Sequence, residues 1–295
     1  MFADACQKVA EFVRPVVVSI RQYDGQVKTQ CGTFMVLNRD GWIVTAGHIY
    51  DSFMKYQTDQ NKLKEIRELN ESRSTRPGAP SMEVKPDPTY ITNHSFWWGW
   101  DGVRLNNVFV NRQVDIAVGR LEPFDPSWVS EYPVLKDPAH VRQGTSLCRM
   151  GFPFADGQIQ SNFDESANAF RIPKFPFRDL LFPNEGIHTR TINRGMSKDG
   201  LFELIYVETS TPGLTGQSGG PIFDREGHIY AMQTETAFLR LGLHPTAEYD
   251  GTTVVENQFL NVGRGVHVKT IRDVLDYRKI RYDAEGDETG FRIID

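Results

Sequence analysis

One glycine-rich stretch of the chain combines a nucleophilic side chain with a permissive backbone. Residues 211–221 read Thr-Pro-Gly-Leu-Thr-Gly-Gln-Ser-Gly-Gly-Pro, with Ser218 near the middle. Glycine adopts backbone conformations that other residues avoid, and it lets a ligand approach the main chain closely. A serine hydroxyl presented by such a turn can attack a carbonyl while neighbouring N–H groups receive the oxyanion. The stretch therefore predicts a nucleophile and an oxyanion site built together, provided that the chain also supplies a base and an acid.

A histidine and an aspartate upstream can supply that base and that acid. His48 follows the compact apolar run 42–44, as a histidine at the end of a buried strand would. Asp115 places one carboxylate inside the otherwise apolar strand predicted over 114–118. A lone buried carboxylate is costly without a partner, so this aspartate is expected to have one.

The order His48, Asp115, Ser218 is the order of the chymotrypsin triad and differs from that of α/β-hydrolases and subtilisins. The three segments resemble the histidine, aspartate and serine motifs of trypsin-like (chymotrypsin-fold) serine peptidases. Two predicted strands, a turn and a histidine over residues 16–48, and again the stretch 141–153, are similar to the bacterial Deg-type branch, here without the PDZ domain that many of its members carry. The resemblance implies a mostly β fold of two packed antiparallel β-barrels, with the active site in the cleft between them.

The resemblance also implies a role for each site residue. His48 would take the proton of Ser218, and Asp115 would hold the imidazole in the required tautomer. The oxyanion site would be formed by Gly216, Gln217 and Ser218, and no metal or organic cofactor would be needed. By family position, the residues expected to form the substrate pocket are Pro212, Gln233, Thr234, Glu235, Thr236, Gly263 and Gly265.

The favoured interpretation is a trypsin-like serine endopeptidase that hydrolyses polypeptide substrates through an acyl-enzyme. Each motif alone also occurs as a purely structural feature, and it is their combination and order that favours catalysis. Two alternatives share the same residues. One is a catalytically silent binding protein with the peptidase fold, and the other is an esterase or acyl-transferring relative.

Composition narrows the class of partner. The chain has 295 residues, of which 39% are hydrophobic, and a net charge of −5, so a surface for nucleic acid is not expected. No apolar run approaches the length of a membrane span, so no membrane partner is expected either. The N-terminus lacks the apolar core of a secretory signal, because four charged residues interrupt it: Asp4, Lys8, Glu11 and Arg14.

The three cysteines indicate a reducing compartment. Cys6, Cys31 and Cys148 are an odd number, lie far apart and form no C-x-x-C pair. This pattern predicts neither a disulfide framework nor a zinc site, and it favours a cytoplasmic location.

The predicted elements divide the chain in two halves with a short helix at each end. The stretch between His48 and Asp115 is long and mixed, with a helical pattern over 62–69, a Pro/Ser/Gly-rich loop over 72–88 and a tryptophan cluster. Control of access by this insertion, by a regulatory partner or by homo-oligomerisation is a possibility that the pattern leaves open. The expected boundaries are an N-terminal barrel half over 1–121 with the insertion at about 51–106, a linker over 122–135, a C-terminal barrel half over 136–280 with a closing helix, and an acidic tail over 281–295.

The residue before Ser218 bears on activation. In trypsin and its secreted relatives, an aspartate at this position pairs with a newly cut N-terminus. Here the position is Gln217, whose uncharged amide cannot stabilise a buried ammonium in the same way. The sequence therefore predicts that no new N-terminus controls the oxyanion loop.

Overall fold

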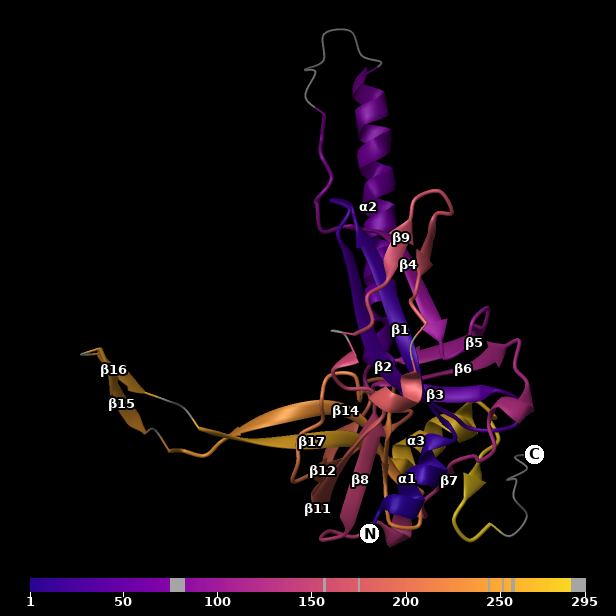
Figure 1. The fold of residues 1–295 in the computed structure, drawn as a ribbon, viewed down its shortest axis with the longest axis vertical. Coiled ribbons are helices and arrows are strands. Elements are labelled where there is room, and N and C mark those ends of the chain that lie inside the picture. The colour runs from indigo at the N-terminus through magenta and orange to yellow at the C-terminus, as the bar shows by residue number, and fades with distance from the viewer. Residues whose placement is uncertain are drawn as a thin grey trace.

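Two β-sheets form the body of the molecule (Figure 1). A computed structural model of the chain describes residues 1–74, 83–155, 158–174, 176–243, 245–250, 252–255 and 258–287. The first sheet contains β1 (Val13–Gln22), β2 (Val27–Val36), β3 (Trp42–Ala46), β4 (Ile91–Trp98), β5 (Arg104–Asn111) and β6 (Ile116–Glu122). The second contains β7 (Val134–Leu135), β8 (Ser146–Gly151), β11 (Phe182–Met196), β12 (Glu203–Thr209), β13 (Pro221–Phe223), β14 (His228–Arg240), β17 (Phe259–His267) and β18 (Asp283–Ala284).

The first sheet has the order β4-β1-β2-β3-β6-β5, and the second has the order β13-β8-β11-β12-β17-β14-β7-β18. Because β13 also pairs with β14, six strands of the second sheet close into a barrel. The remaining elements are α1 (Ala3–Ala10), α2 (Asp51–Ser74), α3 (Val268–Tyr277), the hairpins β9 (Asn162–Asp164) with β10 (Ala169–Arg171) and β15 (Thr246–Tyr249) with β16 (Thr252–Val255), and the short 3-10 helices η1 (Gly47–Tyr50), η2 (Pro126–Trp128), η3 (Pro138–His140) and η5 (Phe177–Leu180). The predicted mostly β, chymotrypsin-like fold class with short terminal helices and a partly helical insertion is confirmed.

A tight turn between β2 and β3 directs the chain toward the centre of the molecule. The Asn38 side-chain oxygen accepts from the backbone N–H groups of Asp40 and Trp42, and Gly41 adopts φ +81°. An Asx-type turn closed by a left-handed glycine reverses the chain in this way. From Ile43 to Ala46, β3 is then fully buried between β2 and β6, and it leads directly into η1.

One continuous apolar core passes through both sheets. Helix α1 adds Ala5 and Val9 to it, and α3 adds Ile271 and Leu275. The ring nitrogen of His267 accepts from the N–H of Lys269 at 3.0 Å and so caps the start of α3. The shared core holds the two sheets against each other, so residues from both can meet in one site.

The stretch expected to be an insertion is partly sheet. Residues 91–98 form β4, which pairs with β1 along its length. Trp98 is buried beside Phe34, while Trp97 stacks on Phe177 at 4.6 Å between ring centroids. The tryptophans therefore pack against the body of the protein, as large aromatic side chains commonly do.

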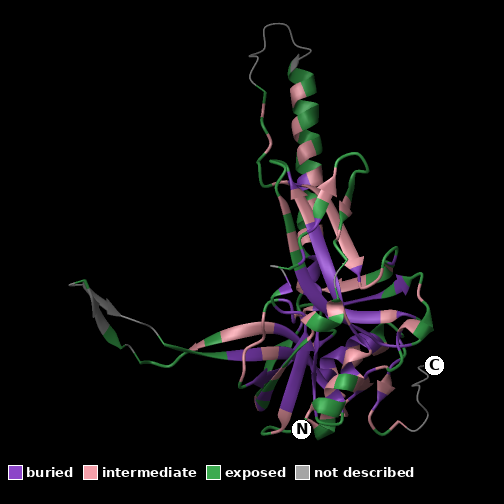
Figure 2. Cartoon of the chain, viewed as in Figure 1, coloured by how far each residue is buried: buried purple, intermediate pink, exposed green. Residues whose placement is uncertain are grey.

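Helix α2 is longer than the pattern over 62–69 predicts, because it begins at Asp51, immediately after η1. It projects away from the sheets, and its outer turns are largely exposed (Figures 1 and 2). Of the predicted loop over 72–88, residues 72–74 belong to α2 instead, and residues 75–82 lie outside the described residues. No described helix combines the length and apolar character needed to cross a membrane.

A second projection is a ribbon made by the outer parts of β14 and β17, with the β15–β16 hairpin beyond it (Figure 1). Large apolar side chains are exposed along it, namely Phe238, Leu241, Leu243, Phe259 and Leu260. At the C-terminal end, residues 283–287 of the expected acidic tail over 281–295 are part of the body of the protein and do not form a solvated tail. There β18 pairs with β7, and Glu285 forms an ion pair with Lys136 at 2.8 Å.

Candidate active site

His48 and Asp115 form a hydrogen-bonded pair at the edge of the first sheet. The ring Nδ1 of His48 lies 2.8 Å from Oδ2 of Asp115, and the backbone N–H of His48 donates to Oδ1 of the same carboxylate at 2.8 Å. Gly47 donates its N–H to the backbone carbonyl of Asp115 at 3.0 Å. Because the carboxylate holds both the ring and the backbone of His48, the imidazole has one fixed orientation and presents Nε2 as its other ring nitrogen.

Asp115 lies immediately before β6 rather than inside a strand, which corrects the sequence prediction. Its backbone has φ +55°, a left-handed conformation that aspartate tolerates better than most residues. This turn places the carboxylate against η1 instead of within the apolar face of β6. The expected partner of the carboxylate is therefore His48, together with one further residue that the sequence did not reveal.

That further residue is Arg112. Its NH1 donates to Oδ1 of Asp115 at 2.5 Å, while its Nε and NH2 bind both oxygens of Asp51 at 2.7 and 2.8 Å. The guanidinium therefore bridges the start of α2 to the carboxylate that orients His48. Nothing in the local pattern marked Arg112, since an arginine three residues before an aspartate is common on protein surfaces.

Thr33 of β2 connects the Ser218 loop to the first sheet. Its Oγ1 donates to the carbonyl of Gly216 at 2.7 Å, and its N–H donates to the carbonyl of Ser218 at 2.8 Å. A β-carbon on Gly219 would lie 2.0 Å from the Thr33 carbonyl oxygen, and Gly219 has φ +87°. Glycine is required there because the loop backbone lies directly on β2. The sequence identified the glycines but not the threonine that they contact.

The backbone of this loop leaves two N–H groups available. Gln217 turns its carbonyl toward the N–H of Gly220 at 2.9 Å, so the N–H of Ser218 in the same planar peptide points the opposite way. Neither that N–H nor the N–H of Gly216 donates to any acceptor in the part of the chain that the structure describes. By contrast, the N–H of Gln217 donates to Leu214 at 2.9 Å. Gln217 is thus a support of the predicted oxyanion site and offers it no free donor.

The side chain of Gln217 is fully buried and fully used. Its Oε1 accepts from the N–H of Leu214 at 2.9 Å, and its Nε2 donates to the carbonyl of Phe182 at 3.2 Å. The amide therefore ties the Ser218 loop to β11 without a charge. This contact fixes the position of the loop from inside the barrel.

Ser218 is half-buried at the junction of two hollows. One, of about 350 Å³, is lined by His48 and Ser218 together with residues of β1 and β2. The other, of about 710 Å³, is lined by Ser218 and the wall of the second barrel. A substrate that crosses Ser218 can therefore place one side chain in each hollow, one on either side of the nucleophile.

Five of the seven predicted pocket residues line the 710 Å³ hollow: Pro212, Gln233, Thr234, Glu235 and Thr236. Gly263 and Gly265 do not line it. The guanidinium of Arg149 covers Gly263, where a β-carbon would lie 2.0 Å from NH1, and Ile222 and Met232 crowd Gly265. The sequence missed Phe154, Gly213, Leu214, Thr215, Phe238 and Asn261, which complete the lining.

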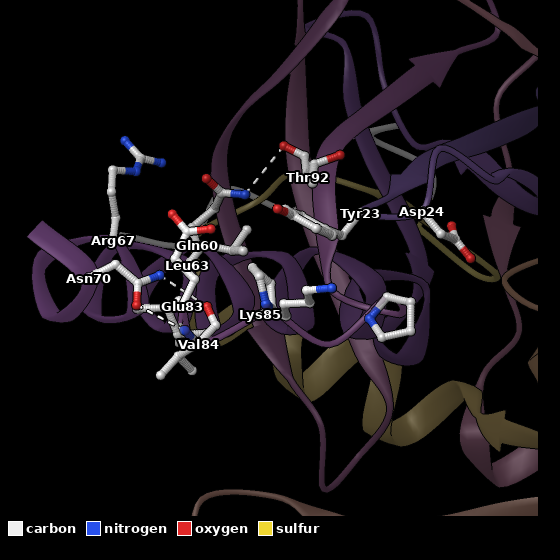
Figure 3. A pocket seen from close by; sticks show the side chains of 13 residues that line it. Tyr23, Asp24, Gln60, Leu63, Arg67, Asn70, Glu83, Val84, Lys85 and Thr92 are labelled. Atoms are coloured by element: carbon white, nitrogen blue, oxygen red, sulfur yellow. Dashed lines mark hydrogen bonds between the residues drawn. The ribbon is translucent and has the colours of Figure 1, made fainter. Parts of the chain in front are cut away.

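A separate hollow of about 770 Å³ lies beside α2 (Figure 3). The Gln60 amide donates to Thr92 there at 3.2 Å, and the Asn70 amide bonds both backbone groups of Val84 at 3.0 Å. None of its lining residues belongs to the two hollows at Ser218.

Among the described residues, no cluster of histidine, cysteine and acidic side chains has the arrangement of a metal site.

Comparisons with known proteins give one family match and a set of similar solved structures. A family model described as "Trypsin-like peptidase domain" matches residues 32–232. Comparison with curated proteins gives no match. Similar solved structures include the HtrA-type protease AlgW with a tripeptide, at 15% identity and a TM-score of 0.47, covering 92% of this chain and 62% of that one. A variant of the same protease with a decapeptide gives 12% identity and a TM-score of 0.47, covering 95% and 68%. The chain thus spans less than two thirds of the length of some of these neighbours.

Proposed function

Because the chain belongs to the family of trypsin-like peptidase domains, we propose that it is a serine endopeptidase with His48, Asp115 and Ser218 as its catalytic triad. The observation that carries the proposal is the 2.8 Å bond from His48 to Asp115 at the edge of a hollow that Ser218 also lines. Nucleophile, base and orienting acid are the three groups that peptide hydrolysis by serine requires.

In this mechanism Ser218 Oγ attacks the carbonyl carbon of the scissile bond while its proton passes to Nε2 of His48. The N–H groups of Gly216 and Ser218 receive the oxyanion of the tetrahedral intermediate. The intermediate collapses, the C–N bond breaks, and His48 returns the proton to the leaving amine. A water molecule then attacks the acyl-enzyme by the same route and releases Ser218. Asp115 stabilises the charged imidazole throughout, and no cofactor takes part.

The polypeptide substrate would extend the second sheet. Beyond Thr234, β14 pairs with β17 on one edge, and no described strand occupies the other edge. An extended peptide can add to such an edge through main-chain hydrogen bonds, with alternate side chains entering pockets. This placement directs the residue on the acyl side of the scissile bond into the 710 Å³ hollow.

The test is hydrolysis of casein and of fluorogenic peptides by purified protein. Ser218→Ala and His48→Ala should each lower kcat by up to about 10⁶-fold, as triad residues act together. Ser127→Ala, on the exposed η2, is the matched control and should retain full activity. Hydrolysis by Ser218→Ala at the wild-type rate would exclude the proposal.

Two further measurements separate the alternatives. A fluorophosphonate probe should label wild-type Ser218 but not the Ser218→Ala variant, whereas a silent binding protein would not react. Peptide and matched ester substrates should both be cleaved, and turnover of esters alone would indicate an esterase or acyl-transferring enzyme.

A cytoplasmic location and control by a partner or by homo-oligomerisation stay predictions.

A further inference from the structure

A buried arginine without a counter-ion lies directly behind the larger hollow at Ser218. The side chain of Arg149, on β8, is 1% exposed, yet among the described residues no carboxylate pairs with it. Its NH1 donates to Oε1 of Gln233 at 2.9 Å, its NH2 bonds Thr209 Oγ1, and its Nε has no partner. Buried charges are normally paired, because an uncompensated one is costly. Burial accordingly lowers the pKa of Arg149 to about 10.

Two glycines shape the space around this arginine. A β-carbon on Gly263 would lie 2.0 Å from NH1 of Arg149, and a β-carbon on Gly213 would lie 2.1 Å from Nε2 of Gln233. The guanidinium and the amide therefore occupy fitted positions between the strands. The charge is held in place by the fold instead of extending to solvent, as most arginine side chains do.

Arg149 also decides which way the Gln233 amide faces. A guanidinium can only donate hydrogen bonds, so it requires the Oε1 of Gln233 on its side. The Nε2 of Gln233 then faces away from Arg149, where one of its hydrogens goes to the carbonyl of Glu235 at 2.9 Å. Gln233 lines the hollow beside Ser218, although only 2% of the residue is exposed, and the second hydrogen of its Nε2 has no acceptor among the described residues. This amide can therefore offer one N–H to a ligand in the hollow, with a positive charge behind it.

The acidic residue in the lining does not cancel this charge. Glu235 accepts from Arg194 at 2.9 Å and from Arg264 at 3.2 Å. Arg264 and Arg190 also bind the buried Glu208 at 3.0 and 2.7 Å. This network thus contains three guanidinium groups and two carboxylates, and Arg149 adds a further positive charge beside it.

We propose that the hollow beside Ser218 selects an acidic side chain, glutamate or aspartate, on the acyl side of the scissile bond. The Gln233 amide donates to the substrate carboxylate, and Arg149 supplies the opposite charge from behind it. Neither residue contacts the reacting atoms, so both determine specificity and not chemistry. The inference rests on the proposed peptidase function, whose substrate class it names.

The test uses peptides that differ only in the residue before the cleaved bond: glutamate, glutamine, leucine or lysine. We expect kcat/KM for glutamate to exceed that for the isosteric glutamine by roughly 10-fold to 100-fold, because charge-assisted hydrogen bonds are about twice as strong as neutral ones. Leucine and lysine should be poorer still. A preference for leucine or lysine over glutamate would overturn the inference while leaving the peptidase function intact.

Variants place the selectivity on the named residues. Arg149→Met should reduce the glutamate-to-glutamine ratio to about 1, and Arg171→Met, on an exposed arginine paired with Asp164, should leave it unchanged. Since Arg149→Met removes a buried side chain, Gln233→Glu is the second variant. It gives Arg149 a counter-ion, so the fold should be retained, and it should abolish the glutamate preference. A ratio unaffected in folded Gln233→Glu would exclude the roles of both residues.

A binding measurement separates this inference from the proposed function. Ser218→Ala protein is titrated with labelled product peptides that end in glutamate, glutamine or leucine. The glutamate peptide should bind at least about 10-fold more tightly than the glutamine peptide. If wild type cleaves no peptide but this preference is found, the peptidase proposal fails and the acidic pocket remains. Equal binding of all three peptides would overturn the pocket.

Discussion

The two loops that meet in the site are built on different principles. The loop that carries Asp115 is held to His48, Asp51 and Arg112 by charged side chains that are partly open to solvent, with exposures from 18% for Asp115 to 56% for Asp51. The loop that carries Ser218 is held by neutral hydrogen bonds from fully buried groups, chiefly Thr33 and Gln217.

This difference predicts different responses to change. An ion pair near solvent is screened by salt and contributes little, so its loss should reduce activity gradually. A buried hydrogen bond that loses one partner leaves the other group unsatisfied, at a cost of about 1–3 kcal/mol. Damage to the Ser218 loop should therefore be more severe than damage to the His48–Asp115 side.

The largest effect is expected at Thr33. Thr33→Val keeps the volume but removes the hydroxyl that donates to the Gly216 carbonyl, so the loop that supplies the oxyanion donors loses its fixed position. We expect kcat/KM to fall by roughly 10²-fold, the order seen when one oxyanion donor is removed.

The control for this variant is Thr29→Val on the same strand, whose hydroxyl bonds Ser161 outside both hollows. It should keep near-normal kcat/KM. Melting temperatures of both variants separate loss of the site from loss of the fold. Equal activity of Thr33→Val and wild type would mean that the loop is positioned without β2.

A smaller effect is expected at Arg112. Arg112→Met removes a partly exposed ion pair worth up to about 1 kcal/mol, so kcat should fall by about fivefold with little change in KM. Added salt should bring wild type closer to the variant, because salt screens the same interaction. Arg112→Lys should recover part of the loss. A decrease of 10³-fold would show that the two loops do not differ in the way described.

The same difference explains what the sequence could predict. The mostly β fold and the three motifs depend on local patterns: the apolar run before His48, the glycines around Ser218, and chain order. The His48–Asp115 contact follows from recognising both motifs. The supports of the Ser218 loop are separated from it by long stretches of chain, and nothing near Thr33 or Phe182 indicates that the loop rests on them.

Two further features were hidden for related reasons. Strand β4 has aromatic residues on both faces, so 91–98 lacked a simple alternation and was assigned to an insertion. Arg149 lies in a stretch that resembles a barrel strand, and only the packing of β8 against Gly263 makes it a neighbour of the substrate pocket. Contacts between distant strands decide both cases, and composition does not encode them.

Charged groups distant from the site should govern acid stability without directing the chemistry. Burial raises the pKa of Asp224, but hydrogen bonds from His228 and Lys136 outweigh it and hold this pKa at about 2. Likewise, bonds from Lys136 and His140 outweigh the burial of Glu285 and hold its pKa at about 2. Both pKa values lie below the ordinary value of about 4. The stability that they contribute is therefore complete above about pH 4 and is lost as the pH falls toward 2.

Melting curves between pH 2 and pH 7 test this expectation. The melting temperature of wild type should be lower at pH 2 than at pH 5, and the difference should be smaller in Asp224→Asn, which has no carboxylate to protonate. Asp179→Asn, at an exposed carboxylate on η5, is the control and should follow wild type more closely. An identical pH dependence in Asp224→Asn and wild type would rule out this cluster as a source of acid sensitivity.

The smallest effect is expected from changes at the N-terminus. In an enzyme activated by a new terminus, the freed ammonium needs a buried carboxylate at the position of Gln217. Here that position holds an amide whose two ends are already bonded to Leu214 and Phe182. Met1 is fully exposed, while α1 packs by Ala5 and Val9. The Ser218 loop is therefore ordered by its own neutral contacts, and an N-terminal tag should leave kcat/KM within about twofold.

The decisive comparison is between tagged protein, protein with the tag removed, and protein cleaved by limited proteolysis near Glu11, in the turn after α1. Cleavage there removes α1 from the core and should lower the melting temperature without raising activity. Gln217→Leu provides the complementary measurement. It leaves the Leu214 N–H and the Phe182 carbonyl unsatisfied, so it should reduce activity whatever the state of the N-terminus. If only the cleaved form hydrolyses substrate, the new N-terminus orders the Ser218 loop. The neutral hydrogen bonds of Thr33 and Gln217 would then not be enough to hold this loop, and the proposed difference between the two loops would be wrong.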